Sequence, residues 1–231
     1  MSNEDHNVEV EEGKVVESKG FTIVGFIEDN SKNLLYAGIA LIVLAGAFYY
    51  YTSIYKPNKE AEANSALYKA ENMFAIDSLD LAMNGDGEFL GLADVADQYS
   101  STAAGARAKY YQGRALMTQG KYEEALEYLD GVSFDDEIVA ALAICLKADC
   151  KAELDQVEEA ADLYMAAANK RENKFTTPYS LSKAARAYGH IGDWEAALEA
   201  LEIIKADYSE TQFAQEIDKE IARARAAAKS N

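Results

Sequence analysis

The chain has 231 residues and a mass of 25.3 kDa, which suits one ordinary domain with accessory segments or two small domains. Its 40 Asp and Glu against 22 Lys and Arg give a formal net charge of -18, which argues against nucleic-acid binding through phosphate neutralisation. Hydrophobic residues make up 49% of the chain, enough for a core, whereas two histidines and two cysteines leave little material for a metal site or a Cys/His nucleophile pair. Composition alone therefore disfavours an enzyme.

Residues 1–32 form an acidic tail with eight acidic and three basic side chains. The first twenty residues are polar and show no helical period, which indicates disorder. A short apolar patch from Phe21 to Ile27 follows. It either lies in a membrane interface as a brief helix or has no ordered structure.

An uncharged run extends from Asn33 to Tyr55, with Lys32 and Lys56 on either side. A helix of this length crosses a hydrocarbon core of roughly 30 Å. Four tyrosines crowd its C-terminal end, where amphipathic rings suit the headgroup zone. We therefore predict a single transmembrane helix over residues 33–55.

Two alternatives to a membrane anchor stay open, a buried core helix and a cleaved signal peptide. The small residues Ala45-Gly46-Ala47 resemble a cleavage site, but the long acidic region before them is unlike the short positive start of a signal peptide. Lysines are balanced on the two sides of the run, so charge does not fix its orientation. A short tail before a large C-terminal domain fits an anchor with its N-terminus in the cytoplasm.

Beyond the membrane run, residues 56–231 are rich in helix-forming Ala, Leu, Glu and Lys. Residues 58–100 are predicted to form a helical pair, interrupted by a turn at Asn84-Gly85-Asp86-Gly87. That turn superficially resembles a calcium loop, but Ala82 and Gly91 stand where ligand carboxylates are required. The core candidates of this pair are Tyr68, Phe74, Ile76, Leu79, Phe89 and Leu92.

Three similar segments recur at offsets of 35 and 37 residues, beginning at Gly120, Asp155 and Gly192. Each has a small residue seven positions earlier, and each carries a central Ala five positions later. A period near 34 with helix–turn–helix punctuation is typical of a solenoid. The earlier small residues are Gly113, Ala148 and Ala185, and the central alanines are Ala125, Ala160 and Ala197.

This pattern resembles the tetratricopeptide repeat family, and the predicted fold class is all-α. We place repeats at about 106–139, 141–174 and 178–211, and a capping helix at 210–229 with Phe213, Ile217 and Ile221 facing inward. Thr177-Pro178 is expected to begin the third repeat, with the hydroxyl as N-cap. In the second repeat Lys151, Asp155 and Val157 depart from the family pattern, and no repeat has the usual closing Pro.

The resemblance implies a ligand groove along the first helix of each repeat, and we expect it to be mildly basic and lined by tyrosines. The competing interpretation is that these residues only solvate the inner face. We predict no catalytic residue, cofactor or metal. The groove residues are Arg107, Tyr110, Arg114 and Met117; Leu142, Cys145, Asp149 and Ala152; and Tyr179, Ser182, Arg186 and Gly189.

The two cysteines, His190 and the basic residues of the last helix are all expected to have structural rather than functional roles. Cys145 and Cys150 point about 140° apart on one helix and are expected to be packed small hydrophobes rather than a redox pair. His190, beside the Gly192 turn, is expected at the surface or in a C-cap. The basic residues of the last helix suit the helix dipole, although a basic binding helix is the alternative; they are Lys219, Arg223, Arg225 and Lys229.

The order of tail, span and three repeats resembles the YfgM family of ancillary Sec translocon subunits. Segments that carry the resemblance include Ile76-Asp77-Ser78-Leu79, Asn84-Gly85-Asp86-Gly87 and Asn173-Lys174-Phe175-Thr176-Thr177-Pro178, in a Bacteroidetes-type version. The resemblance implies a non-catalytic single-pass protein of the bacterial inner membrane. Its tail would be cytoplasmic and its repeat domain periplasmic. The implied partners are SecYEG, a PpiD-type membrane-anchored chaperone and secretory clients.

Two other functions remain open at this point. One is a general membrane-tethered scaffold of cell-envelope or division machinery, since repeats of this kind are specific for fold and poor for function. The other is an enzyme, which would need a deep polar pocket with converging carboxylates. The sequence offers no motif for such a pocket.

Overall fold

The computed structural model describes residues 26 and 30–230, and the chain divides into two compact units, Met1–Ile54 and Tyr55–Asn231. The predicted disorder of the first twenty residues lies outside the described part. So does the apolar patch at 21–27, except for Phe26, which is helical and exposed. Each unit is taken by itself below.

The described part of the first unit consists mainly of α2, Ser31–Tyr50. A π-helical turn, η1 at Tyr51–Tyr55, continues its backbone, and the Thr52 hydroxyl donates to the Phe48 carbonyl at 2.9 Å. The helical stretch is long and apolar enough, by length and composition, to cross a membrane, and none of its 18-residue apolar window is buried. This full exposure disfavours the alternative of a buried core helix.

The second unit is a stack of helices, and no strand occurs among residues 30–230; the only bridge joins Gly85 and Leu90. The predicted all-α class is thereby confirmed. Its elements are α3 (Lys56–Ala75), α4 (Leu79–Asn84), α5 (Leu92–Gln98), α6 (Ala103–Thr118), α7 (Tyr122–Leu129), α8 (Glu137–Glu153), α9 (Val157–Lys170), α10 (Thr176–Ile191), α11 (Trp194–Asp207), η2 (Gln212–Ala214) and α12 (Ile217–Ala228).

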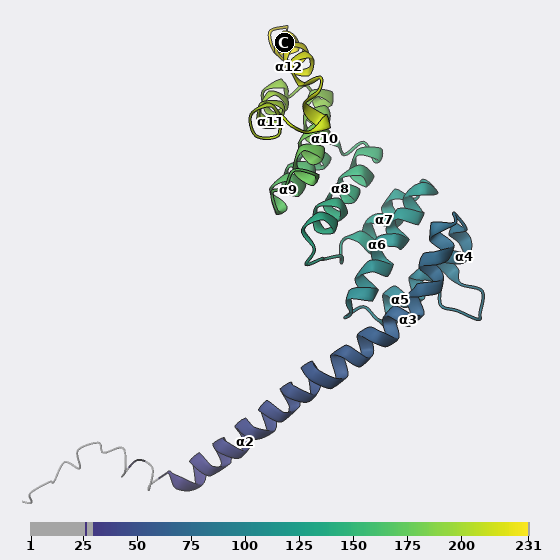
Figure 1. Ribbon diagram of the computed structural model, residues 1–231, viewed down its shortest axis with the longest axis vertical. Helices are drawn as coiled ribbons and strands as arrows, with labels where there is room; N and C mark the ends of the chain where they lie inside the picture. The colour runs from purple at the N-terminus through teal and green to yellow at the C-terminus, as the bar shows by residue number, and fades with distance from the viewer. Residues whose placement is uncertain (1–25, 27–29, 231) are drawn as a thin grey trace, which may run out of the picture. The chain divides into compact units, whose positions relative to one another are not determined.

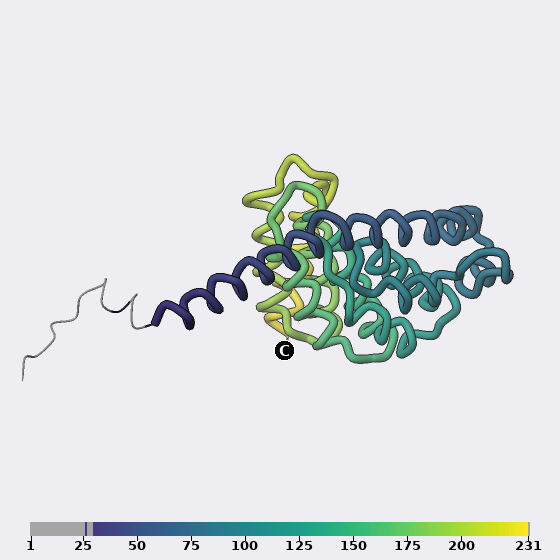
Figure 2. The backbone as a smooth tube through the Cα atoms, turned by 90° about the horizontal axis from the view of Figure 1, so that it is seen from below, coloured from purple at the N-terminus to yellow at the C-terminus, as the bar shows by residue number. Residues whose placement is uncertain are grey.

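The helices pair into the hairpins α6/α7, α8/α9 and α10/α11, which follow one another in chain order (Figures 1 and 2). Small residues let the two helices of a hairpin approach closely. A Cβ at Gly113 would stand 2.7 Å from the Leu129 side chain, so α6 and α7 meet at this point. The small residues that the sequence singled out are all buried: Ala148, Ala185, Ala125, Ala160 and Ala197.

All three hairpins close with the same backbone turn. Gly120, Asp155 and Gly192 have φ values of 73°, 61° and 83°, in the left-handed region. In each case the next amide donates to a carbonyl five residues back, at 2.9–3.0 Å, and the left-handed residue itself donates three residues back. This bonding satisfies helix-end carbonyls, and Asp tolerates the left-handed conformation better than most residues. Asp155 therefore replaces glycine without changing the turn.

Lys151 departs from the pattern of large apolar residues, but it is accommodated at the surface of the second hairpin. Its side chain is 25% exposed, and its ammonium group lies 2.8 Å from both Gln156 Oε1 and Glu159 Oε2. The aliphatic stem can thus cover apolar surface while the charged end stays paired.

A fourth hairpin, α3/α4, was missed in the sequence. Asp77 has φ 61°, its amide donates to Phe74, and the amide of Ser78 donates to Met73, as in the other three turns. The buried Ala70 and Ala82 occupy the two small positions. The offset from Asp77 to Gly120 is 43 residues rather than 35, because a loop at 85–91 interrupts the second helix and separates α4 from α5.

The prediction of a simple helical pair at 58–100 was therefore wrong, and two of its six core candidates lie outside the core. Tyr68 is 64% exposed because α3 buries the face of Ala63, Leu67 and Ala70, from which Tyr68 is turned away. Ile76 follows the last residue of α3 at the turn and is 68% exposed. Leu92 is fully buried, and Phe74, Leu79 and Phe89 pack partly buried against the core.

The segment 84–87 forms the predicted turn. The Asp86 carboxylate accepts hydrogen bonds from the amides of Glu88 and Phe89 at 2.8 and 3.2 Å, so it serves the backbone of its own loop. Gly85 has φ 70°, and a Cβ there would stand 2.3 Å from the Phe89 carbonyl oxygen. Glycine is therefore required at this position.

The start of α10 differs in detail from the prediction. The helix begins at Thr176, one residue before Thr177, and the cap is the Asn173 side chain, whose Oδ1 accepts from the amides of Phe175 and Thr176 at 2.9 and 2.8 Å. Thr177 instead accepts from the amide of Asn173 at 3.0 Å. Pro178 lies buried within the first turn, where its missing donor costs nothing.

A C-terminal helix packs on the last hairpin, but α12 begins at Ile217 rather than at residue 210, because the 3-10 turn η2 precedes it. Ile217 and Ile221 are buried against α11, and Phe213 of η2 contacts the Tyr179 ring at a centroid distance of 6.1 Å. Of its basic residues, Arg225 pairs with Glu202 at 2.7 Å and Lys219 with Glu216 at 3.1 Å.

Candidate functional site

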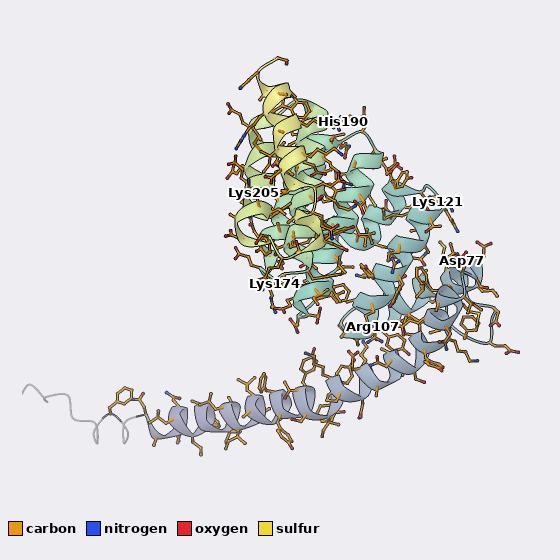
Figure 3. All side chains as sticks on the ribbon, turned by 45° about the horizontal axis from the view of Figure 1, so that its top comes forward. Asp77, Arg107, Lys121, Lys174, His190 and Lys205 are labelled. Atoms are coloured by element: carbon orange, nitrogen blue, oxygen red, sulfur yellow. The ribbon has the colours of Figure 1, made fainter. Side chains whose placement is uncertain are left out.

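The predicted groove residues lie on α6, α8 and α10, the first helices of three consecutive hairpins. Turns between the two helices of a hairpin lie at one edge of the unit, marked by Lys121 and His190 in Figure 3. Arg107 and Lys174 mark the opposite edge. We call the face of α6, α8 and α10 that carries the predicted groove residues the inner face. Some of its charged side chains form ion pairs with neighbouring helices, and others form none.

Arg107 is engaged with α3 rather than free. Its guanidinium lies 3.2 Å from Glu71 Oε1 and donates to Asn64 Oδ1 at 2.8 Å. One turn earlier, Glu60 accepts from the amides of Ala103 and Ala104 at 2.7 and 3.0 Å, which satisfies the exposed N-terminus of α6. Arg107 thus belongs to a polar seam that joins α3 to α6.

Arg114 presents a free cation above aromatic rings. Its guanidinium carbon lies 5.3 Å from the centroid of Phe74 and 5.8 Å from that of Tyr110. The Tyr110 ring meets Phe134 edge-on at 5.9 Å, and burial raises the pKa of its hydroxyl. Met117, one turn further along α6, is half-buried beside this cluster. An exposed arginine over half-buried rings is typical of a binding hot spot.

Asp149 is neutralised by residues of the two neighbouring helices. Lys183 Nζ of α10 lies 2.6 Å from its carboxylate, and the Tyr164 hydroxyl of α9 donates to the same oxygen. The ammonium group also lies 5.3 Å from the ring centroids of both Tyr164 and Tyr179. We name these four residues, Asp149, Tyr164, Tyr179 and Lys183, the lysine cluster.

The surroundings in the lysine cluster raise the pKa of two of its members, Lys183 and Tyr164. Burial opposes the charge of Lys183, but the hydrogen bond and attraction of Asp149 outweigh it, so the pKa of the ammonium group is raised. Burial, together with the hydrogen bond to Asp149, raises the pKa of the Tyr164 hydroxyl. Lys183 and Tyr164 were not predicted as site residues, because Tyr164 lies on a second helix and Lys183 is one position away from the groove pattern.

Cys145, which was expected to line the groove, is instead buried in the core and has no features of a nucleophile. It is 1% exposed, and its Sγ lies 3.2 Å from Ser180 Oγ, which itself donates to the Thr176 carbonyl. The thiol is therefore the donor, and burial raises its pKa. Cys150 is also buried and free, and burial raises its pKa to about 11. The prediction that both cysteines are packed small hydrophobes is confirmed.

Two hollows open along α10. One, of about 360 Å³, lies between α8, α9 and α10 and is lined by Ala152, Tyr164, Lys183 and Arg186 among others. The second, of about 430 Å³, lies between α10, α11 and α12. Arg186 and His190 line both hollows and stand between them. Both side chains are exposed, which for His190 agrees with the surface position expected from the sequence. Leu142 and Ser182 are half-buried on the same inner helices.

The chemistry of this surface is that of recognition. Within the described residues no group of three or more His, Cys, Asp or Glu side chains is arranged to hold a metal ion. The inner face offers aromatic rings and two cations, Arg114 and Arg186, that make no ion pair with any part of the described chain. Rings and guanidinium groups on rigid helices suit contact with a polypeptide.

The comparisons with known proteins agree with this fold. Two crystal structures of the nearly identical TPR-like repeats of a Podosopora anserina protein described as a kinesin light chain align with a TM-score of 0.54. The alignments cover 74% of this chain and 89% of those chains, at 22% and 21% sequence identity. No protein-family model and no curated protein matches the sequence. The chain therefore has the fold of a TPR-like helical-repeat solenoid, and this similarity is one of fold alone.

Proposed function

We propose that the protein is a non-catalytic interaction scaffold that binds a partner polypeptide along the inner face of α6, α8 and α10. The observation that carries this proposal is a pair of cations that make no ion pair within the described residues, Arg114 of α6 above the Phe74 and Tyr110 rings and Arg186 of α10 beside two hollows. A preformed surface pays little ordering entropy on binding. The fold of TPR-like repeats supports the same function.

We further propose that the scaffold is anchored in the bacterial inner membrane through α2 and serves the Sec translocon, as a YfgM-like subunit would. The exposed apolar helix and the order of tail, span and repeats support this assignment. The segments that carry the resemblance are turns and caps of the solenoid, at Asp77, Asp86 and Asn173. They shape the scaffold, so the identity of its partners, SecYEG and a PpiD-type chaperone, rests on the resemblance.

In-cell crosslinking tests the partner. A photo-crosslinking phenylalanine analogue at Tyr110 or Tyr179 is expected to capture SecY or a PpiD-type chaperone. Arg114→Glu should reduce capture through Tyr110 at least about fivefold, because hot-spot arginines contribute more than 1 kcal/mol. Lys121→Glu is the matched control, since it makes the same charge change at an exposed turn residue outside the inner face. Equal capture in both variants would remove the groove proposal.

The same captured proteins decide between the two scaffold functions. Purification of the full chain in mild detergent should bring SecY with it if the translocon assignment holds. Partners drawn instead from cell-envelope or division machinery would replace that assignment while keeping the scaffold.

Membrane topology provides an independent prediction. Protease added to intact spheroplasts is expected to degrade residues 60–231 and to spare the acidic tail, which an epitope at the N-terminus would report. The reverse pattern of digestion would overturn the proposed periplasmic location of the repeat unit. Complete digestion of both parts would show that the chain is not held across the membrane.

A further inference from the structure

A pocket of about 430 Å³ lies where the last hairpin meets the C-terminal helix. The indole of Trp194 forms one wall, and it lies so close to α10 that a Cβ at Gly189 would stand 3.0 Å from the ring. The floor is apolar and buried, and is made by Ala185, Ala197, Leu201 and Ala224. We call this site the Trp194 pocket. Its size and apolar lining suit a bulky side chain.

The rim of the Trp194 pocket is charged. Arg186 and His190 of α10 stand on one side, and Glu220 and Arg223 of α12 on the other, so two guanidinium groups oppose one carboxylate. Neither arginine makes an ion pair within the described chain, although eight other cationic side chains do. Those eight are Arg107, Lys147, Lys151, Lys174, Lys183, Lys205, Lys219 and Arg225.

Arg186 and Arg223 are two of twelve Lys and Arg side chains in residues 30–230 that make no ion pair, and they are set apart by their place around an apolar hollow. The chain carries a net charge of -18, so carboxylates that could neutralise a surface arginine are abundant. Arg186 and Arg223 nevertheless remain without one at the mouth of an apolar hollow. A complementary ligand must bring an anionic group for the rim and an apolar group for the floor. Planar guanidinium groups are suited to carboxylates, which they can bind through paired hydrogen bonds.

We infer that the Trp194 pocket binds a polypeptide segment in which a carboxylate stands beside a bulky apolar side chain. The carboxylate accepts hydrogen bonds from Arg186 and Arg223, and the apolar group lies against the indole and the alanine-lined floor. This inference rests on the proposed scaffold function and specifies the chemistry of the bound segment. The carboxylate belongs either to a chain terminus or to an Asp or Glu side chain, and the test separates these two sources.

Trp194 is the single tryptophan of the chain, so its fluorescence reports directly on the pocket. The full-length protein in detergent micelles is titrated with four peptides. Two are acetyl-Gly-Ser-Gly-Ser-Leu-Phe with a free carboxylate and its C-terminal amide. The others are acetyl-Gly-Ser-Leu-Glu-Phe-Ser-Gly-amide and its Gln counterpart. We expect at least one carboxylate peptide to change the Trp194 emission and to bind about tenfold or more tightly than its neutral counterpart.

Two double variants provide the matched comparison. The double variant Arg186→Gln, Arg223→Gln is expected to bind the carboxylate peptide about tenfold or more weakly, because both guanidinium donors are lost. Lys121→Gln with Lys229→Gln removes the same charge from exposed positions outside the pocket and should leave the affinity unchanged. Far-UV circular dichroism checks that each variant is folded. If a variant fails to fold, the inference is still tested, because charged and neutral peptides are also compared on the unaltered chain.

Three results would overturn the inference: no emission change with either carboxylate peptide, equal binding of the neutral peptides, or equal loss in the two double variants. These failures are distinguishable from failure of the scaffold function. Partner capture through Tyr110 together with a silent Trp194 would remove the pocket assignment alone. A Trp194 response without any partner captured through Tyr110 would support the pocket and remove the partner surface around Tyr110 and Arg114.

Discussion

Leu129→Ala is expected to lower the free energy of unfolding by about 2–5 kcal/mol, since it deletes a large side chain from a packed interior. Leu129 is 1% exposed, and its side chain fills the space that the missing side chain of Gly113 leaves between α6 and α7. The solenoid has no alternative contact for this interface, because each hairpin packs mainly on its neighbours. Urea denaturation of the full chain in detergent, followed by circular dichroism, measures the change.

The control for this substitution is Leu81→Ala on α4, where the leucine is 43% exposed and the loss should stay below about 1 kcal/mol. Hydrogen exchange adds spatial detail, because opening of one hairpin should expose its own amides first. Amides of α6 and α7 are expected to lose protection before those of α10 and α11. Equal effects of the two leucine substitutions, or uniform loss of protection, would contradict a stack of separately packed hairpins.

Asp149→Ala is expected to lower the free energy of unfolding by about 1–3 kcal/mol, because it leaves the partly buried ammonium group of Lys183 without its acceptor. Lys183→Met alone should cost less, since its apolar side chain suits the space between the Tyr164 and Tyr179 rings. The double variant should lose less free energy of unfolding than the sum of the two single losses. The difference should be about 0.5–3 kcal/mol, the range for contacting residues. Urea denaturation of all four proteins gives this coupling.

The same lysine cluster predicts loss of stability at alkaline pH. The pKa of Lys183 and that of Tyr164 are both raised in the folded chain, so the folded state holds protons that the unfolded state releases. Their contribution is complete below about pH 10, the range of the unfolded groups, and is lost as pH rises above it. The free energy of unfolding should therefore fall more steeply above about pH 10 in the natural chain than in the Asp149→Ala variant. Parallel pH profiles would show that the cluster is not coupled to folding.

The inner helices α6, α8 and α10 show what a repeat spacing can place and what it cannot. The spacing placed Tyr110 and Arg114 on the first helix of one repeat and Arg186 on that of another, and the structure puts them on α6 and α10. It also selected Arg107, whose charge is taken up by Glu71 of α3. A spacing rule identifies the face of a helix, but it contains no information about which side chain of another hairpin reaches that face.

The missed first hairpin has a different cause. The spacing of Ala70, Asp77 and Ala82 repeats that of Gly113, Gly120 and Ala125, and the structure gives both turns the same hydrogen bonds. The loop at 85–91 lengthened the interval to 43 residues and hid the similarity from a search for a period near 35. Alignment of turns, rather than of whole repeats, would have found it.

The sequence by itself indicated the helices of three hairpins, their turns and the apolar stretch at 33–55, because these depend on small residues at fixed spacings, on left-handed turn residues and on an uninterrupted apolar run. The tertiary structure alone decided which charges are neutralised and which stay free. The ion pair of Asp149 with Lys183, and the meeting of Arg186 with Arg223 around Trp194, join residues of helices that only stacking brings together. The physical reason is that burial and ion pairing depend on distances across the stack, which no local pattern encodes.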